Sequence, residues 1–412
     1  MIPFIRDNAR WLAGGFLLTL ISSFGQTFFI GLSGNDLRAT FDLSDGAFGL
    51  LYMGATIASA LTLPWLGRTL DVMPGWKVVR FSVPCLAASC LLMALAPHVL
   101  VLALSLYLLR LFGQGMMTHI ALTETGRWFV ANRGRAMSLV VPGHQLGEAL
   151  LPVGFVLLSV IVGWRGAWVG AACVVLFVAY PALLQLLRVE RMPRSQDLHA
   201  RQSSGRDWTR GEVVRDPYFY LLLVGVLAPP FIGTTIFFHQ GHLTELRGYD
   251  PLAFAAAFPL MAATTLAFAL ACGWLIDRFG ALRLLPFLLI PLAFASAAVG
   301  LLTATWGIYV FMVLFGISYG VTSTLLGALW PEIYGLAHLG AIRAIIVSAM
   351  VLATAIGPGL TGALIDLGIA LPQQLLWMGG WCIAASLALA VAAKAIRLRT
   401  ASEAAGVRAG MA

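Results

Sequence analysis

Long apolar stretches separated by short polar segments run through the whole chain. Twelve of them are about 20 to 25 residues long, and each is long enough for a helix to cross roughly 30 Å of hydrocarbon. Because a bilayer core offers no water to satisfy backbone polar groups, these stretches are predicted to be helices. The pattern predicts an all-α membrane protein with twelve transmembrane helices, near residues 11–34, 46–66, 77–96, 99–123, 136–160, 165–187, 217–240, 252–276, 283–303, 306–330, 341–365 and 372–396.

Two of the polar segments between spans share a pattern. The first reads GRTLDVMPGWKVVR and the second GWLIDRFGALR, and in each a glycine stands four residues before an aspartate. The matched pairs are Gly67 with Asp71 and Gly273 with Asp277, which are 206 positions apart in a chain of 412 residues. A duplicated polar segment at half the chain length predicts two homologous halves. We therefore expect two pseudo-symmetric six-helix bundles around a central cavity.

The division into domains follows from the longest polar segment. Residues 188–216 are charged and poor in apolar side chains, unlike the segments on either side. We expect an N-terminal bundle at 1–187, a linker at 188–216, and a C-terminal bundle with a short tail at 217–412.

Composition supports the membrane assignment. The chain is 60% hydrophobic and 11% charged, with a mean hydropathy of +0.89, whereas soluble domains carry roughly 25% charged residues. Its net charge of +8 is spread over short loops and forms no single basic stripe, so we expect no nucleic-acid partner. The five cysteines lie inside apolar stretches without a CxxC pattern, which predicts neither a metal site nor a cofactor.

The basic residues predict the orientation. Twenty-two of the 26 Lys and Arg fall on one side of the predicted spans, the side that holds both termini. Cytoplasmic loops carry such an excess, so both termini are predicted to be cytoplasmic. The Arg-rich, Lys-poor composition indicates a GC-rich bacterium. We therefore expect a multi-pass protein of the inner membrane, whose helices contact the lipid bilayer.

Twelve spans in two halves with duplicated loops resemble the major facilitator superfamily. The loop signature is carried by Gly273, Asp277, Arg278 and Gly280, and the first copy keeps Gly67, Asp71, Gly75 and Lys77 but has Val72 where a basic residue is usual. The resemblance implies alternating access, in which two six-helix halves rock around a central site. It also implies that both loops take part in gating, through Gly67, Asp71, Lys77, Gly273, Asp277 and Arg278.

Polar residues at mid-span depth are the candidates for the transport site. Arg110 lies at the centre of the fourth span, where an unpaired charge costs roughly 2.5–3.5 kcal/mol on insertion scales. Glu148 of the fifth span is the expected counter-charge, and His144 lies one turn away on the same face. The Gln114-Gly115 pair resembles the fourth-helix motif of the family, displaced by one residue. We expect Glu148 and His144 to form a proton pathway.

The remaining candidates come from other spans. Gln26 is expected to line the cavity from the first span, His239 from the seventh and Tyr319 from the tenth. Pro229 and Pro230 are predicted to break the seventh helix, because neither can donate a backbone hydrogen bond. Four tryptophans near span ends are interpreted as interface anchors, namely Trp164, Trp168, Trp306 and Trp377.

The chain lacks the phosphate-binding GxxxxGK[ST] loop and the HExxH motif, so we expect a gradient-driven secondary transporter and not an enzyme. The substrate stays open between a small organic anion moved with protons and an amphipathic or drug-like compound exported by antiport. A third alternative is a non-transporting receptor or assembly factor on the same scaffold. We expect a monomer.

Overall fold

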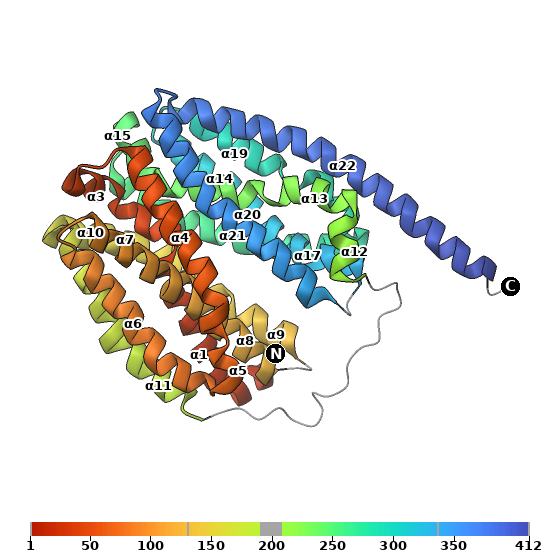
Figure 1. Ribbon diagram of the computed structural model, residues 1–412, viewed down its shortest axis with the longest axis horizontal. Coiled ribbons are helices and arrows are strands. Elements are labelled where there is room, and N and C mark those ends of the chain that lie inside the picture. Colours follow the sequence, from red (N-terminus) through yellow and green to blue (C-terminus); the bar gives the residue numbers. More distant parts are fainter. Residues whose placement is uncertain (1, 130–131, 190–207, 336–337, 411–412) are drawn as a thin grey trace. The chain divides into compact units, whose positions relative to one another are not determined.

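In a computed structural model, the chain is helical throughout the described residues, which are 2–129, 132–189, 208–335 and 338–410 (Figure 1). The helices of the first part are α1 Ile2–Ile21, η1 Ser22–Gly25, α2 Thr27–Ile30, η2 Gly31–Ser33, α3 Gly34–Phe41, α4 Asp45–Gly67, α5 Thr69–Val72, α6 Gly75–Leu95, α7 Val99–Leu108, η3 Leu109–Met117, α8 Thr118–Trp128, α9 Arg133–Val140, α10 Pro142–Cys173, η4 Val174–Ala179 and α11 Tyr180–Leu187. Those of the second part are α12 Arg210–Arg215, α13 Pro217–Val226, α14 Ala228–Phe238, α15 Gln240–Arg247, α16 Pro251–Ala256, α17 Phe258–Phe279, α18 Ala281–Leu284, η6 Leu285–Phe287, α19 Ile290–Leu301, α20 Trp306–Tyr334, α21 Leu339–Asp366 and α22 Leu371–Gly410. The prediction of an all-α membrane protein is confirmed.

The number of spans depends on how two irregular segments are divided. Among the described residues, ten helices are long and apolar enough to cross a membrane, or eleven if the bent pair Phe4–Gly25 and Thr27–Phe41 is one span. One of the ten runs over 54 residues, Gly134–Leu187, far more than one crossing needs. Gly163 interrupts this segment with φ 73°, a conformation that glycine adopts without steric cost. Dividing this segment at Gly163 and also counting the bent pair as one span gives twelve, the predicted number.

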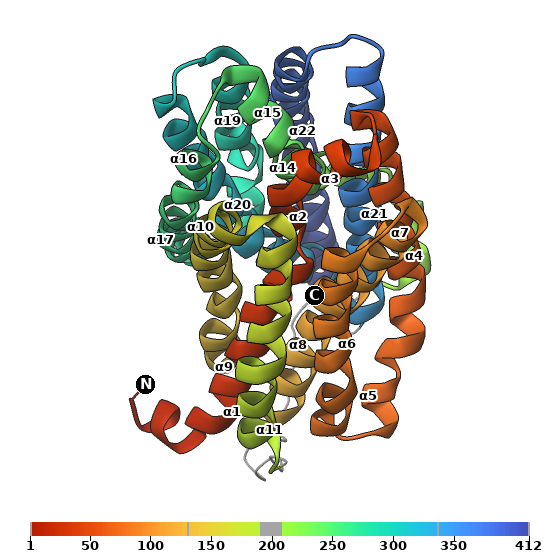
Figure 2. The ribbon, with the colours of Figure 1, turned by 90° about the vertical axis from the view of Figure 1, so that its left-hand side faces the viewer.

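The chain groups into two compact units by contact. Unit 1 comprises Met1–Arg201, Thr234–Ala262 and Pro358–Gly368, and unit 2 comprises Gln202–Gly233, Ala263–Gly357 and Ile369–Ala412. Within unit 1, α11 packs beside both α1 and α6 (Figure 2). Unit 1 therefore includes short segments from the second half of the sequence, and the repeat-based domain boundaries stay a prediction.

The first span of unit 1 is broken near its middle. The helices on either side of Gln26 meet at 45°, and Gln26 itself is extended, with φ −82° and ψ 153°. The neighbouring segment η3 of the fourth span is π-helical, an irregularity frequent at functional sites. The two irregular segments interlock, since a Cβ at Gly25 would lie 2.6 Å from the Gln114 nitrogen and 2.7 Å from the Gly113 Cα. The close backbone contact thus requires glycine.

In unit 2, the chain that follows the predicted linker is anchored at Asp216. Of the predicted linker at 188–216, residues 190–207 lie outside the described residues. Asp216 begins α13 and accepts hydrogen bonds from Arg399 at 3.0 Å and the Tyr334 hydroxyl at 3.3 Å. Arg399 belongs to α22, one continuous helix that ends near the C-terminus (Figure 1). These contacts tie the start of α13 to α20 and α22.

Candidate functional site

Arg110 is buried at the break in the first span. Its side chain is 1% exposed, and Nη1 donates to the Gly25 carbonyl at 3.2 Å and weakly to Thr27 Oγ1 at 3.5 Å. The guanidinium also lies 5.5 Å from the centre of the Tyr52 ring, within the range of a cation–π interaction. The two remaining nitrogens, Nε and Nη2, are buried without a hydrogen-bond partner among the described residues. These two nitrogens carry three N–H groups that no described residue accepts.

The expected ion pair between Arg110 and Glu148 is not formed among the described side chains. Glu148 lies on α10 at 2% exposure, and its Oε2 has no hydrogen-bond partner in the described part of the chain. His144 is one turn away on α10, with its ring 6.2 Å from the Phe28 ring. Both Arg110 and Glu148 are buried, but the described side chains are not in contact with each other.

Aromatic rings line the same unit beside His144. The Phe28 ring lies 5.7 Å from Phe258, which in turn lies 5.3 Å from Phe237. Gln26 and Gln114 are both half-buried near Arg110, on the break and on η3. Unit 1 therefore contains the buried Arg110 and Glu148 together with these three phenylalanine rings and two glutamine side chains.

The first predicted gating loop is held by residues of α8. Gly67 packs on His119, since a Cβ there would lie 2.9 Å from Nε2, and a Cβ at Gly75 would lie 2.8 Å from Glu124 Oε2. Arg127 donates to the Leu70 carbonyl. Lys77 lies 5.6 Å from the Trp76 ring centre. The side chain of Asp71 lies outside the described part of the structure.

The second loop has a related arrangement in unit 2. Glu332 of α20 accepts from the Ala281 amide at 2.7 Å and from the Leu282 amide at 3.4 Å, at the start of α18. The Glu332 carboxylate thus lies at the start of the ninth span, just as the Glu124 carboxylate lies at Gly75, the start of the third span. The two helix starts, Gly75 and Ala281, are 206 positions apart. Among the described residues Asp277 is exposed and makes no hydrogen bond, and Arg278 lies over the Trp274 and Phe279 rings.

The seventh span is interrupted next to its two prolines. Helix α13 ends at Val226 and α14 begins at Ala228, so that Pro229 and Pro230 lie in the first turn of α14, where a missing amide hydrogen costs no helical bond.

Tyr319 lies on α20 in unit 2. Its side chain is 36% exposed, and its ring stacks on that of Phe315 with the ring centres 5.9 Å apart.

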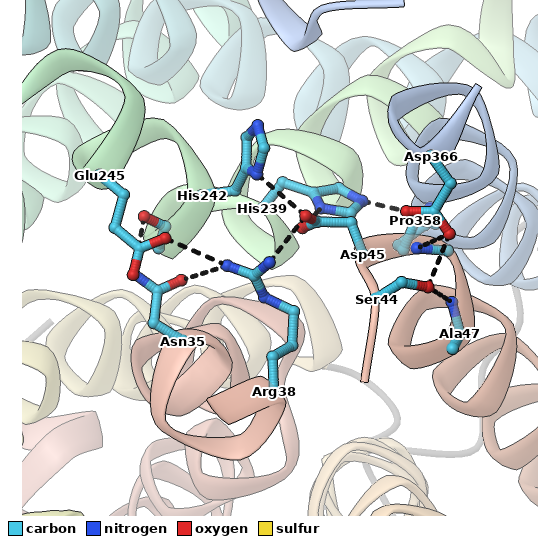
Figure 3. A network of polar contacts seen from close by, with 12 residues as sticks. Asn35, Arg38, Ser44, Asp45, Ala47, His239, His242, Glu245, Pro358 and Asp366 are labelled. Carbon is cyan, nitrogen blue, oxygen red and sulfur yellow. Dashed lines mark hydrogen bonds and ion pairs between the residues drawn. The ribbon is translucent and has the colours of Figure 1, made fainter. Parts of the chain in front are cut away.

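His239 joins a polar cluster at the end of unit 1 that the basic residues predict to face outside (Figure 3). Asp45 accepts from Arg38 at 2.7 Å and contacts His242 Nδ1 at 3.0 Å and His239 Nδ1 at 3.6 Å. Nε2 of His239 lies 3.0 Å from the Pro358 carbonyl oxygen. Other bonds join the same elements: Arg38 to Glu245 and Asn35, Asn35 to Gly241, and Ser44 and Gly46 to Asp366. We call these residues the outer cluster.

Sequence reasoning missed most of the outer cluster. Arg38, Asp45, Glu245 and Asp366 stand at span ends, where charged residues are common, and nothing in their spacing marks them as partners. One contact beside them has a sequence signal, because Asn35 and Gly241 are 206 positions apart and form a hydrogen bond. The interpretation of Trp168 as an interface anchor was wrong, because its ring is fully buried and donates to Ser33 at 2.9 Å.

Comparison with known proteins identifies the family. The model of the Major Facilitator Superfamily matches residues 15–358, most of the chain. The chain belongs to the Major Facilitator Superfamily. This membership makes it a protein of a transporter family.

Solved structures share the fold of this transporter. A bacterial homologue of the human lysosomal transporter Spinster, inward-facing and unoccupied, is 15% identical with a TM-score of 0.67, over 96% of this chain and 95% of that one. The nucleoside transporter NupG, in a mutant form, is 12% identical with a TM-score of 0.71, over 93% of this chain and 99% of that one. None of the curated proteins matches the chain. At such identities the likeness concerns the fold alone.

Proposed function

We propose that this transporter moves a small organic anion together with protons by alternating access. The observation that carries the proposal is Arg110, a buried cation with two unpaired nitrogens and no acidic partner among the described residues. A guanidinium presents two parallel N–H groups to a carboxylate, and the bond is strong where water is excluded. An anionic ligand would supply the missing charge.

Glu148 is proposed as the proton carrier. Its carboxylate is buried and has an unpartnered oxygen, and an isolated buried charge is costly. A proton on Glu148 would remove that cost, and its release would restore the charge after the site opens to water. The proton and the anion would thus occupy separate groups in one unit.

The cellular setting of the proposal follows from the sequence. We infer a monomer in the inner membrane of a bacterium, with both termini in the cytoplasm, because the basic residues collect on the side of the termini.

Transport by purified protein in liposomes tests the anion site. Wild-type protein is expected to take up one or more labelled carboxylates when a proton gradient is imposed. Arg110→Gln should weaken apparent affinity by about 10–100-fold, equivalent to about 1.4–2.8 kcal/mol. Arg6→Gln is the matched control, since the Arg6 side chain is 83% exposed. Unchanged carboxylate uptake by the Arg110 variant would contradict the proposal that Arg110 binds the anion.

The proton role has its own measurement. Glu148→Gln should abolish accumulation driven by the proton gradient but retain exchange of labelled for unlabelled substrate, because the anion site is intact. Asp42→Asn is the control, an exposed turn residue with φ 51° that asparagine also tolerates. Undiminished gradient-driven uptake in the Glu148 variant would contradict the proposal.

A second candidate is supported by the aromatic rings of Phe28, Phe237 and Phe258. Such rings suit an amphipathic cation, and export by proton antiport would then replace anion uptake. Including lipophilic cations in the same substrate panel separates the two. Binding of a ligand without transport of any compound would instead favour a receptor or assembly factor.

A further inference from the structure

His239 lies between two hydrogen-bond acceptors. On one side Nε2 is 3.0 Å from the carbonyl oxygen of Pro358, and on the other Nδ1 is 3.6 Å from Asp45 Oδ1. A carbonyl only accepts hydrogen bonds, so the contact with Pro358 needs a hydrogen on Nε2. In a neutral ring Nδ1 would then present its lone pair to the carboxylate. Only the doubly protonated imidazolium interacts favourably with both neighbours.

His242 differs from His239 in this respect. Its Nδ1 is 3.0 Å from Asp45 Oδ2, and no second acceptor contacts the ring among the described residues. A neutral ring with its hydrogen on Nδ1 can donate to Asp45. Its side chain is 21% exposed, whereas that of His239 is 2% exposed. The contact of His242 is therefore compatible with either charge state.

The other charges around His239 come from four elements. Helix α3 contributes Arg38 and Asp36, α4 contributes Asp45, α15 contributes His242 and Glu245, and the end of α21 contributes Asp366. Arg38 disfavours a positive ring, but it is already paired with Asp45 and Glu245. The Asp45 carboxylate, 3.6 Å from Nδ1, favours a positive ring.

The contacts of His239 connect segments far apart in the chain. Asp45 begins the second span, His239 precedes α15, and Pro358 lies near the end of the eleventh span. Glycines let the same segments approach closely, since a Cβ at Gly49 would lie 2.6 Å from the Pro358 carbonyl oxygen. Separating these segments would break both contacts of His239.

We propose that the outer cluster is a proton-operated latch, in which a proton bound by His239 holds the predicted outer ends of the second, seventh and eleventh spans together. A proton arriving from outside would close the outer end and so precede opening toward the cytoplasm. This latch is separate from the proposed anion site at Arg110 and does not depend on it. That the latch lies on the outer side of the membrane follows from the predicted orientation.

A distance measurement without substrate tests the latch. Spin labels at Thr40→Cys and Leu246→Cys, both exposed positions, are placed in a background with Cys85 and Cys173 replaced by Ser. Double electron–electron resonance in lipid nanodiscs at about pH 8 and about pH 5.5 spans the range where histidine titrates. The ratio of short to long distances should rise on acidification by up to about tenfold per pH unit, the limit for one proton.

Variants identify the responsible group. His239→Gln should lose the pH dependence, since glutamine can donate to Pro358 but cannot gain a proton, whereas His242→Gln should keep it. His98→Gln, an exposed histidine of another loop, is the control. If His239→Gln does not give monodisperse protein, Asp45→Asn supplies the same readout by removing the charge opposite the ring. A wild-type distance distribution independent of pH, or full pH dependence in either His239→Gln or Asp45→Asn, would overturn the latch.

Discussion

At the scale of single residues, the proposed function rests on polar groups with incomplete hydrogen bonding. Arg110 and Glu148 are both buried with unpaired atoms, although an unsatisfied buried polar group typically costs 1–3 kcal/mol, and more when charged. Selection for folding stability alone would not retain such groups. Their presence is explained if a ligand and a proton complete the missing bonds during transport.

Gly25 is the residue on which the position of Arg110 depends. Gly25→Ala should destabilise the protein by about 1–3 kcal/mol, the usual cost of overpacking, because the added Cβ meets backbone atoms of Gln114 and Gly113 that cannot rotate away. Thermal unfolding in detergent measures the change.

The control for that substitution is Gly54→Ala. A Cβ at Gly54 meets nothing within 4 Å, so this change should be neutral or stabilising by up to about 1 kcal/mol. Equal melting temperatures for the two variants would show that the contact between η1 and η3 is looser than described.

At the scale of helices, the irregular segments position the polar groups of the candidate site. The break at Gln26 frees the Gly25 carbonyl to accept from Arg110, and the π-helical η3 carries Arg110 toward it. The prolines of the seventh span begin a new helix at α14. Long regular helices supply the frame, whereas interrupted ones supply exposed backbone groups and places to bend.

Glu332 holds the start of the ninth span. Glu332→Ala should cost about 0.5–2 kcal/mol, the range for losing a helix cap, because the amides of Ala281 and Leu282 lose their acceptor. Hydrogen exchange should accelerate at residues 281–285 and remain unchanged in α22.

Glu332→Gln is the graded comparison for this helix. One amide oxygen can still accept, but the negative charge at the helix start is lost, so exchange should be intermediate. Exchange in Glu332→Ala equal to that of the wild type would contradict the capping role.

At the scale of the whole molecule, the two halves of the sequence are related by a repeat of 206 residues. Gly31 packs on the Phe237 carbonyl, and Asn35 bonds Gly241. In both contacts a residue meets the residue that stands 206 positions later in the sequence. The same offset relates the two hinge loops. Independent contacts thus support the duplication.

The predicted topology is testable by labelling. A membrane-impermeant maleimide should react with Thr40→Cys from outside and with Gly211→Cys only after the membrane is opened, because five predicted crossings separate the two exposed positions. Labelling is scored by gel shift in intact and permeabilised cells. Reaction of both positions from the same side would contradict the assigned spans.

Much of the fold could be predicted because it depends on local sequence. The length of each apolar stretch determines a helix, and loop arginines indicate the side on which it ends. The duplicated loops indicated the family, which the match over residues 15–358 confirms. Predicted spans such as 306–330 differ from α20, Trp306–Tyr334, only at their ends.

Only the tertiary structure decided which polar groups are partners. Arg110 and Glu148 were expected to pair and do not, whereas Asp45 and His239 do, across 194 positions of sequence. Hydropathy reports the depth of a side chain in the bilayer, but not which way it points around its helix. Rotation, breaks and glycine contacts set that direction, so the proposed anion site and the proposed latch could be recognised only once the helices are packed.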